Sequence, residues 1–362
     1  MKHLDEYRDP AAVKTLVDAV RAAATRRWTL MEVCGGQTHA ILRNGLDELL
    51  TECVELIHGP GCPVCITPET ILDQAAVLAR TPGITLCTFG DMLRVPGALG
   101  DLQAARAAGG DVQVVYSPLD AVAQARDNPE REVVFLSVGF ETTAPAAALA
   151  VLQARALGLE NFSLLVSHAL VPPAMAGLLD DPERRVQGFL AAGHVCTVEG
   201  AGPYHVLAAR YRVPIVITGF EPVDLLDGVL ACVRQLERGE ARVENRYRRV
   251  SREEGNARAR AMVDQVFEPA DREWRGLGRL PASGLALRPA FRDFDAVARF
   301  RPETPAPAGE SPCIAGEVLR GVRRPTDCPA FGGACTPDHP LGAPMVSSEG
   351  ACAAYLNYRR AG

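Results

Sequence analysis

The sequence lacks several features that would assign it to common protein classes. None of its apolar runs approaches the length of a membrane-spanning helix, so we expect no membrane association. It has no G-x-x-x-x-G-K-[ST] motif, and no G-x-G-x-x-G motif follows a strand-like segment, so the usual backbone cradles for ATP and dinucleotides are unsupported. The net charge of −6 argues against nucleic-acid binding. The first six residues do not resemble a signal peptide, and we therefore expect a cytoplasmic protein.

The composition is that of a globular protein with substantial cores. The chain has 362 residues, 48% of them hydrophobic and 23% charged, which is compatible with two or three domains. It also has eleven cysteines. Because thiols stay reduced in the cytoplasm, so many cysteines favour metal or redox chemistry over a disulfide framework.

Strand-like and helix-like segments alternate along most of the chain, which is typical of βαβ units and a parallel sheet. We predict an α/β fold with two parallel-sheet βαβ domains and a loop-rich, mostly helical C-terminal iron–sulfur domain. The expected divisions are an N-terminal helix packed on another domain, two α/β domains and the C-terminal domain, at residues 1–27, 28–117, 118–238 and 239–362. Weak periodicity predicts loops and short helices over residues 268–312.

One proline- and glycine-rich segment, H-G-P-G-C-P-V-C, contains Cys62 and Cys65. Two sulfurs at C-x-x-C spacing can form a disulfide or bind one metal ion, so half of a structural zinc site is the alternative to a redox pair. The prolines and glycines hold the segment out of helix and sheet, and we expect the stiff backbone to present both thiols.

A second cysteine, Cys34, lies where an expected strand passes into a helix. Free backbone N–H groups and the helix dipole favour a thiolate at such a junction. Gly35 and Gly36 leave room for close approach of a ligand, although a small buried hydrophobe is the simpler interpretation of Cys34. His39 is either a hydrogen-bonded structural histidine or an acid–base or ligand group.

The triplet Gly-Phe-Glu occurs twice, each time directly after an apolar strand, and it contains Glu141 and Glu221. Ligands of open α/β sheets bind outside the carboxyl ends of the strands, so the two turns are expected to face one cleft. The alternative is that both glutamates cap the helices that follow.

Four cysteines lie in a C-terminal segment rich in glycine and proline, with the spacing C-x14-C-x6-C-x16-C. Four thiolates suit a [4Fe–4S] cluster or a zinc site, and the absence of paired C-x-x-C knuckles among them favours the cluster. These residues are Cys313, Cys328, Cys335 and Cys352. Four further cysteines, within or at the ends of expected strands and helices, are interpreted as packing residues: Cys53, Cys87, Cys196 and Cys232.

Four of these segments, residues 31–39, 58–65, 139–145 and 345–352, together resemble the HypD family of [NiFe]-hydrogenase maturation factors. The resemblance implies a scaffold that acts with the small chaperone HypC. On this scaffold an iron centre would acquire two cyanides and one carbon monoxide as a transient Fe(CN)2CO group, with cyanide supplied by HypE.

The resemblance also implies roles for individual cysteines. Cys34 would be a ligand of that iron, shared with a cysteine of HypC, and Cys62 and Cys65 would be a redox pair. The four C-terminal cysteines would hold a [4Fe–4S] cluster. By loop position, Glu141, Glu221 and His39 are candidates to orient the iron or relay protons. A cluster-dependent thiol–disulfide reductase using Cys62 and Cys65, and a purely structural zinc protein, are the alternatives.

Overall fold

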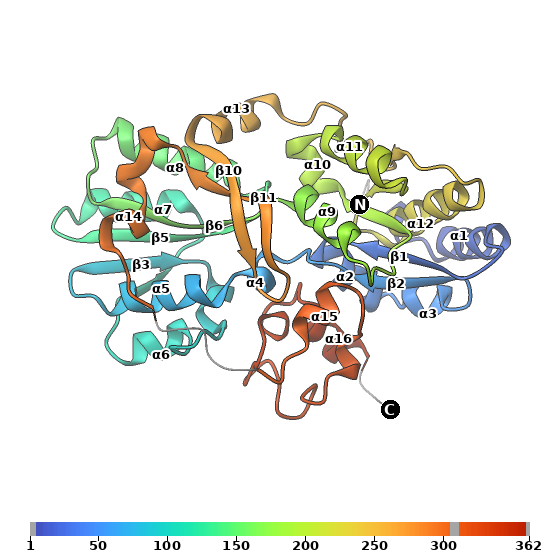
Figure 1. Cartoon of the computed structure of the whole chain (residues 1–362), viewed down its shortest axis with the longest axis horizontal. Helices are drawn as coiled ribbons and strands as arrows, with labels where there is room; N and C mark the ends of the chain where they lie inside the picture. The colour runs from blue at the N-terminus through green and yellow to red at the C-terminus, as the bar shows by residue number, and fades with distance from the viewer. Residues whose placement is uncertain (1–4, 305–310, 360–362) are drawn as a thin grey trace.

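The computed structural model describes residues 5–304 and 311–359, and it contains two parallel sheets flanked by helices (Figure 1). The first sheet, at the right of Figure 1, has the strand order β2-β1-β7-β8-β9. Its strands are β1 (Trp28–Glu32), β2 (Val54–His58), β7 (Gly188–Ala192), β8 (Ile215–Thr218) and β9 (Val243–Asn245). The predicted α/β fold class is confirmed.

Helices cover both faces of the first sheet because alternate strand residues enter two different cores. Leu30 and Leu190 face a core with α1 (Pro10–Ala23), α3 (Leu46–Leu50) and α12 (Pro222–Glu237). Met31 and Phe189 face a core built from the opposite side by α9 (Val171–Asp180), α10 (Gly193–Glu199) and α11 (Gly202–Tyr211). The N-terminal helix therefore packs on the first sheet.

The second sheet, at the left of Figure 1, has the order β4-β3-β5-β6. Its strands are β3 (Ile84–Thr88), β4 (Val112–Val114), β5 (Glu132–Gly139) and β6 (Phe162–His168). Its covering helices are α5 (Glu69–Arg80) and α6 (Leu102–Ala107) on one face, and α7 (Pro118–Asp127), α8 (Ala144–Ala156) and α13 (Ala257–Val266) on the other. Residues of β5 enter both cores, as expected for a nearly continuous apolar strand.

We expected the first α/β domain to end at residue 117, but the chain does not divide into its two sheets at that point. The chain forms β1 and β2, builds the entire second sheet, and then returns to complete the first sheet with β7 to β9. The return depends on Gly188, which pairs with Leu30 in the parallel register. A Cβ at Gly188 would lie 2.5 Å from the Cys232 sulfur, so a larger residue there would force this side chain to shift. Strand–helix alternation is the same in both sheets and does not specify which strands pair.

Residues 268–312 also differ from the expectation, because the structure has a long antiparallel hairpin where loops and short helices were predicted. It consists of β10 (Phe267–Trp274) and β11 (Gly278–Leu287), and runs between the two sheets (orange in Figure 1). Pro269 and a register shift between Ala270 and Arg272 interrupt its period-two pattern, which hid it in the sequence. Its base, with α14 (Ala296–Phe300), packs against the second sheet.

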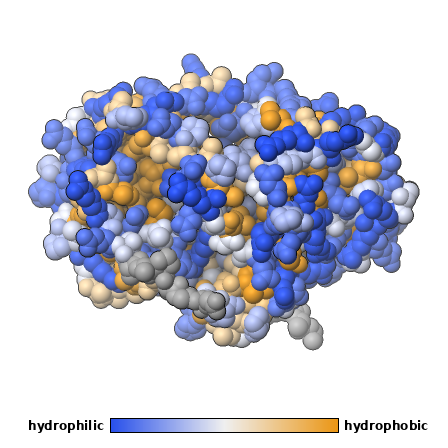
Figure 2. All heavy atoms as spheres, viewed as in Figure 1, coloured by the Kyte–Doolittle hydropathy of each residue, from blue (hydrophilic) through white to orange (hydrophobic). Residues whose placement is uncertain are grey.

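The cysteine-rich C-terminal segment, residues 311–359, lies beneath the junction of the two sheets (Figure 1). It contains α15 (Ala315–Leu319), α16 (Ala351–Tyr358) and several tight turns. It has one small apolar cluster of its own and shares a second with Leu42. Polar side chains cover most of the face shown in Figure 2, with smaller apolar areas between them. In the described part of the chain, no helix has the length and apolar character needed to cross a membrane.

Candidate functional site

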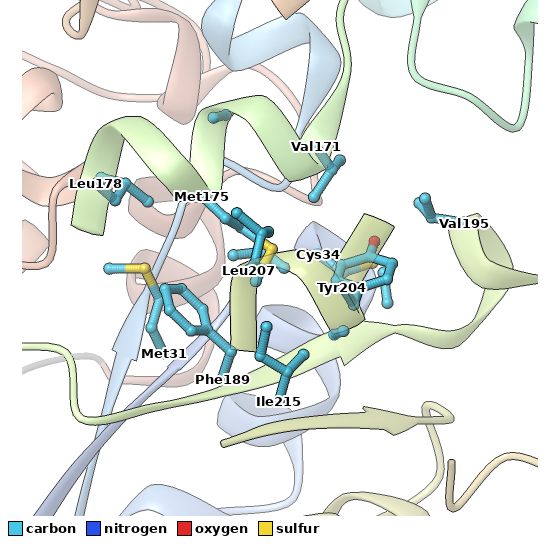
Figure 3. Close-up of a cluster of buried hydrophobic side chains, with 14 of the residues drawn as sticks. Met31, Cys34, Val171, Met175, Leu178, Phe189, Val195, Tyr204, Leu207 and Ile215 are labelled. Carbon is cyan, nitrogen blue, oxygen red and sulfur yellow. The ribbon is translucent and has the colours of Figure 1, made fainter. Parts of the chain in front are cut away.

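Cys34 lies at the predicted strand–helix junction, as the N-cap residue of α2 (Gly35–Arg43) directly after β1. Its side chain is only 4% exposed, at the edge of an apolar cluster that includes Met175 and Phe189 (Figure 3). The thiol sulfur lies 3.9 Å from the Nδ1 atom of His194. His194 is at the start of α10, directly after β7, which pairs with β1. Sequence reasoning did not identify His194 as the neighbour of Cys34, since 160 residues separate them.

The expectation that this strand–helix junction favours a thiolate is wrong in the structure. Burial raises the pKa of Cys34 to about 12, the carboxylates of Glu32 and Glu349 add to the shift, and hydrogen bonding from nearby backbone N–H groups only partly opposes it. His194 brings no compensating positive charge at neutral pH, because burial lowers its pKa to about 4. Cys34 is therefore a protonated thiol at neutral pH in this structure.

A buried carboxylate, Glu32, organises the backbone around Cys34. It is fully buried and accepts hydrogen bonds from the backbone N–H of Cys34, at 2.9 Å, and from the hydroxyl of Thr38. Its other contact is His58, whose Nδ1 atom lies 2.6 Å away and whose Nε2 atom lies 3.2 Å from the hydroxyl of Tyr355 in α16. Glu32 and His58 are paired in the register of β1 and β2. We did not predict this network from the sequence. Its signal in the sequence was Glu32, a charged residue at the end of an apolar strand.

Cys62 and Cys65 form a disulfide in the structure, with their Cα atoms 5.3 Å apart. They lie at the N-cap of and within the short helix α4 (Pro63–Ile66), and they are 3% and 1% exposed. The expectation that the stiff backbone presents both thiols is therefore wrong. The glycines of the motif instead let the loop pack tightly against the rest of the site.

The disulfide loop rests directly on the Cys34 turn. The backbone N–H of Gly35 donates to the carbonyl of Gly61 at 2.9 Å, and that of Gly59 donates to the carbonyl of Glu32 at 2.8 Å. A Cβ at Gly61 would lie 2.2 Å from the backbone nitrogen of Cys34. Two cysteine motifs separated by more than twenty residues thus form one compact unit.

The C-terminal segment closes another side of this unit. A Cβ on Gly35 would clash with the backbone and side chain of Glu349, so the segment lies against the first turn of α2. His39 extends this contact: its Nδ1 atom lies 3.3 Å from the carbonyl oxygen of Ser348, and its Nε2 atom lies 3.2 Å from the hydroxyl of Tyr358. The polar contacts of the His39 ring thus connect α2 to the C-terminal segment.

Glu141 is buried between the two sheets, with 2% of its surface exposed. Its Oε1 atom accepts a hydrogen bond from the backbone N–H of Val171 at 2.7 Å, at the start of α9, whereas Oε2 has no hydrogen-bond partner among residues 5–304 and 311–359. Burial raises the pKa of Glu141 to about 8, and the nearby Glu199 adds to the shift. If Glu141 were ionised, its charge would raise the pKa of Cys196 and of Tyr204, which lie in helices of the first sheet. Glu141 therefore holds a proton at neutral pH.

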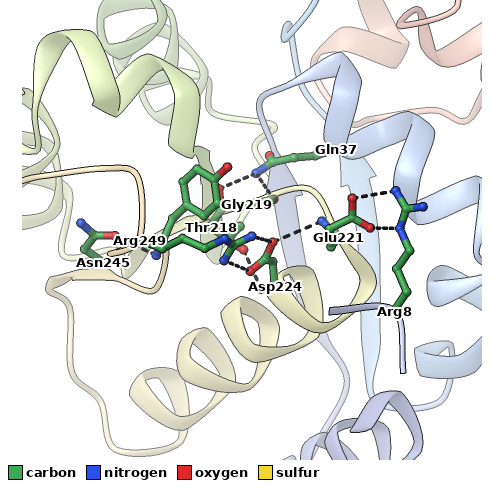
Figure 4. Close-up of polar contacts among 9 residues, drawn as sticks. Arg8, Gln37, Thr218, Gly219, Glu221, Asp224, Asn245 and Arg249 are labelled. Carbon is green, nitrogen blue, oxygen red and sulfur yellow. Dashed lines mark hydrogen bonds and ion pairs between the residues drawn. The ribbon is translucent and has the colours of Figure 1, made fainter. Parts of the chain in front are cut away.

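Glu221 has different surroundings, because it caps α12 in a capping box with Asp224 and forms an ion pair with Arg8 (Figure 4). Its side chain is 20% exposed, so the two glutamates do not share one buried environment. The phenylalanines of the two Gly-Phe-Glu turns, in contrast, lie in the surroundings of Cys34 and His194. Phe140 belongs to the same apolar cluster as Cys34, and the Phe220 ring lies 5.2 Å from that of His194.

The four C-terminal cysteines lie near one another in residues 311–359. Cys328, Cys335 and Cys352 share one apolar cluster. Burial raises the pKa of Cys352 and of Cys313, and the other three thiols raise that of Cys352 further. The backbone N–H of Leu341 donates to the Cys335 sulfur at 3.3 Å.

Four neighbouring, partly to fully buried thiols are the donor set that a [4Fe–4S] cluster requires, and N–H···S bonds are common around such clusters. In residues 5–304 and 311–359, no three His, Cys, Asp or Glu side chains already converge at metal-binding distances, so the four thiols would have to reorient to bind it. The remaining cysteines, Cys53, Cys87, Cys196 and Cys232, are all buried, which agrees with their interpretation as packing residues.

Comparisons with known proteins agree with the resemblance seen in the motifs. The HypD family model, described as "Hydrogenase formation hypA family", matches residues 11–359. The chain is 49% identical to the hydrogenase maturation factor HypD of Azotobacter vinelandii, in an alignment that covers 99% of this chain and 97% of the relative. It is 45% identical to that of Escherichia coli K12, with 99% of both chains covered. The chain therefore belongs to the HypD family of hydrogenase maturation factors.

Proposed function

We propose that this protein is the scaffold and redox partner for assembly of the Fe(CN)2CO group of [NiFe]-hydrogenase. In this proposal it acts in the cytoplasm in complex with HypC, and it receives cyanide from HypE. The iron being assembled is its substrate, and Cys34 is the ligand that this chain contributes. The observation that carries the proposal is the direct packing of the Cys62–Cys65 disulfide loop on the Cys34 turn.

A thiol ligand suits this substrate because soft sulfur donors match low-spin iron that carries strong-field diatomic ligands. Burial keeps Cys34 protonated and away from solvent in this structure, and this also protects the thiol from oxidation. Loading with iron then requires the disulfide loop or the C-terminal segment to move aside. Loss of the Cys34 proton accompanies iron binding, since only the thiolate is a ligand.

The disulfide gives the site a second chemistry. Reduction of the Cys62–Cys65 bond takes up two electrons and two protons and yields two thiols within the loop that touches Cys34. Cys313, Cys328, Cys335 and Cys352 would hold a [4Fe–4S] cluster, which supplies one-electron redox chemistry when bound. His194 and Glu32 keep the Cys34 turn in place, through the thiol and the backbone N–H respectively.

The observed disulfide also favours a second candidate, a cluster-dependent thiol–disulfide reductase that uses Cys62 and Cys65. Exposures of 3% and 1% argue against it, because thiol–disulfide exchange needs an accessible sulfur. A reductase that uses only Cys62 and Cys65 would also give the Cys34 turn no function.

Infrared spectroscopy in the cyanide and carbonyl stretching region separates the two candidates. The protein is purified without oxygen after co-expression with HypC and HypE, alongside Cys34→Ser and a control, Cys53→Ser, which changes another buried cysteine. Bands in the wild type and the control that are absent from Cys34→Ser support the scaffold. If no bands appear although the cluster is intact and HypC is bound, the scaffold proposal fails. Turnover of the disulfide with a generic thiol partner in the absence of HypC then favours the reductase.

A further inference from the structure

The turn of the β10–β11 hairpin touches three separate parts of the site with three consecutive residues. Trp274 is fully buried and its ring stacks on that of Phe140, with the ring centroids 6.0 Å apart. Phe140 belongs to the apolar cluster that contains Cys34. The indole N–H of Trp274 donates to the Ser283 hydroxyl at 2.9 Å, which fixes the ring. The first residue of the turn is thus anchored in the apolar cluster that contains Cys34.

Arg275 binds the disulfide helix and its surroundings. Its backbone N–H donates to the carbonyl of Ile66 at 2.9 Å, and Ile66 is the residue after Cys65. Its guanidinium donates to the carbonyl of Pro96 and to the carboxylate of Glu69, each at 2.8 Å. The side chain is only 15% exposed, so these contacts are made largely out of water.

Gly276 contacts the cysteine-rich segment through its backbone. A Cβ at Gly276 would lie 2.7 Å from the Cα of Gly316, and a Cβ at Gly316 would clash with the carbonyl of Gly276. Gly316 lies in α15, three residues after Cys313. With a φ of +79°, Gly276 also adopts a conformation that favours glycine. The turn and the four-cysteine segment therefore meet backbone to backbone.

We propose that the hairpin turn, residues 274–276, fixes the relative positions of the Cys34 turn, the Cys62–Cys65 disulfide and the four-cysteine segment. Arg275 is the positioning residue at its centre, through its contacts with Ile66, Pro96 and Glu69. The positions of these segments rest on contacts within this chain, and only their use in iron assembly rests on the proposed function.

Two glycines of the hairpin provide a matched test of the positioning role. Gly276 and Gly278 both have φ values of +79°, but a Cβ at Gly278 would meet no other atom within 4 Å. Gly276→Ala and Gly278→Ala therefore carry similar backbone strain and differ in the contact with Gly316. The readout is the rate at which dithiothreitol reduces Cys62–Cys65 in the full-length protein, followed by labelling of the released thiols.

We expect Gly276→Ala to accelerate this reduction roughly tenfold, because the turn must withdraw from Gly316 and loosens the disulfide helix through Ile66. Gly278→Ala should react at the wild-type rate. Equal rates for the two variants would overturn the positioning role. This comparison does not depend on a cluster, so its outcome is separate from that of the proposed function.

The role of Arg275 is tested in the same assay with Arg275→Met and the control Arg279→Met, whose side chain is 76% exposed on the same hairpin. Arg275→Met should accelerate the reduction of Cys62–Cys65, because it removes the hydrogen bonds to Pro96 and Glu69, and Arg279→Met should react at the wild-type rate. A wild-type rate in Arg275→Met would overturn the role of Arg275.

Discussion

A single methyl group at Gly61 should uncouple the disulfide loop from Cys34. A Cβ at this position would lie 2.2 Å from the backbone nitrogen of Cys34 and 2.4 Å from the carbonyl carbon of Val33. Both are backbone atoms at the end of a central strand, so they cannot rotate away as a flexible side chain would. Ordinary contact distances begin at 3.4 Å, and the loop must therefore withdraw by about 1.2 Å (3.4 − 2.2).

This displacement should affect function far more than stability. Overpacking a well-packed region costs about 1–3 kcal/mol, which a protein of this size tolerates. A misplacement of about 1 Å between reacting groups, in contrast, can reduce a rate by about 100-fold. We expect Gly61→Ala to fold, to bind the cluster normally, and to mature hydrogenase about 100-fold more slowly than the wild type.

The assay is hydrogenase activity in cells whose own HypD-family gene is deleted and replaced by each variant, with urea unfolding of the purified proteins. Gly202→Ala is the control, because a Cβ there meets no atom within 4 Å. Wild-type maturation by Gly61→Ala would refute the reasoning, since the loop and Cys34 would then not need their close packing.

Three other perturbations test separate parts of the structure. The pKa of Glu141 is about 8 in the folded state instead of 4.5, so the free energy of unfolding of the wild type falls as pH rises from about 4.5 to 8. Glu141→Gln cannot ionise and should avoid up to about 5 kcal/mol of this loss. Urea unfolding should therefore show the variant gaining stability relative to the wild type between pH 5 and pH 8, and a constant difference would contradict the buried protonated state. Glu32→Gln should lower the free energy of unfolding by about 1–3 kcal/mol, because an amide cannot accept from all three of its buried donors; wild-type stability in urea would show that the network is dispensable. Removal of iron by a chelator should direct limited proteolysis first to residues 311–359, where ligand bonds replace a large apolar core; equal protection with and without iron would argue against a cluster in this segment.

Much of the local structure could be predicted because it depends on short-range chemistry. The alternation of strand-like and helix-like segments predicted parallel βαβ units, and both sheets are parallel. The position of Cys34 between a strand and a helix followed from the change of hydrophobic period and the glycines after it. The cysteine-containing motifs also indicated the family correctly.

Other features of the site required the tertiary structure. The burial of the Cys62–Cys65 disulfide depends on a loop that packs against Cys34, and the proximity of His194 to Cys34 depends on the pairing of β1 with β7. The raised pKa of Cys34 follows from the same burial, which outweighs the helix terminus that the sequence suggested.

The sequence by itself determined the α/β class, most of the strands and helices, the cysteine motifs and the family, because hydrophobic period, turn residues and motif spacing are local properties of the chain. The tertiary structure alone decided which strands share a sheet, that β10 and β11 form a hairpin, and that residues 274–276 lie against both the disulfide helix and α15. These features arise from packing between segments far apart in the chain, where the fit of backbone and side chains in three dimensions, and not local preference, sets the lowest free energy.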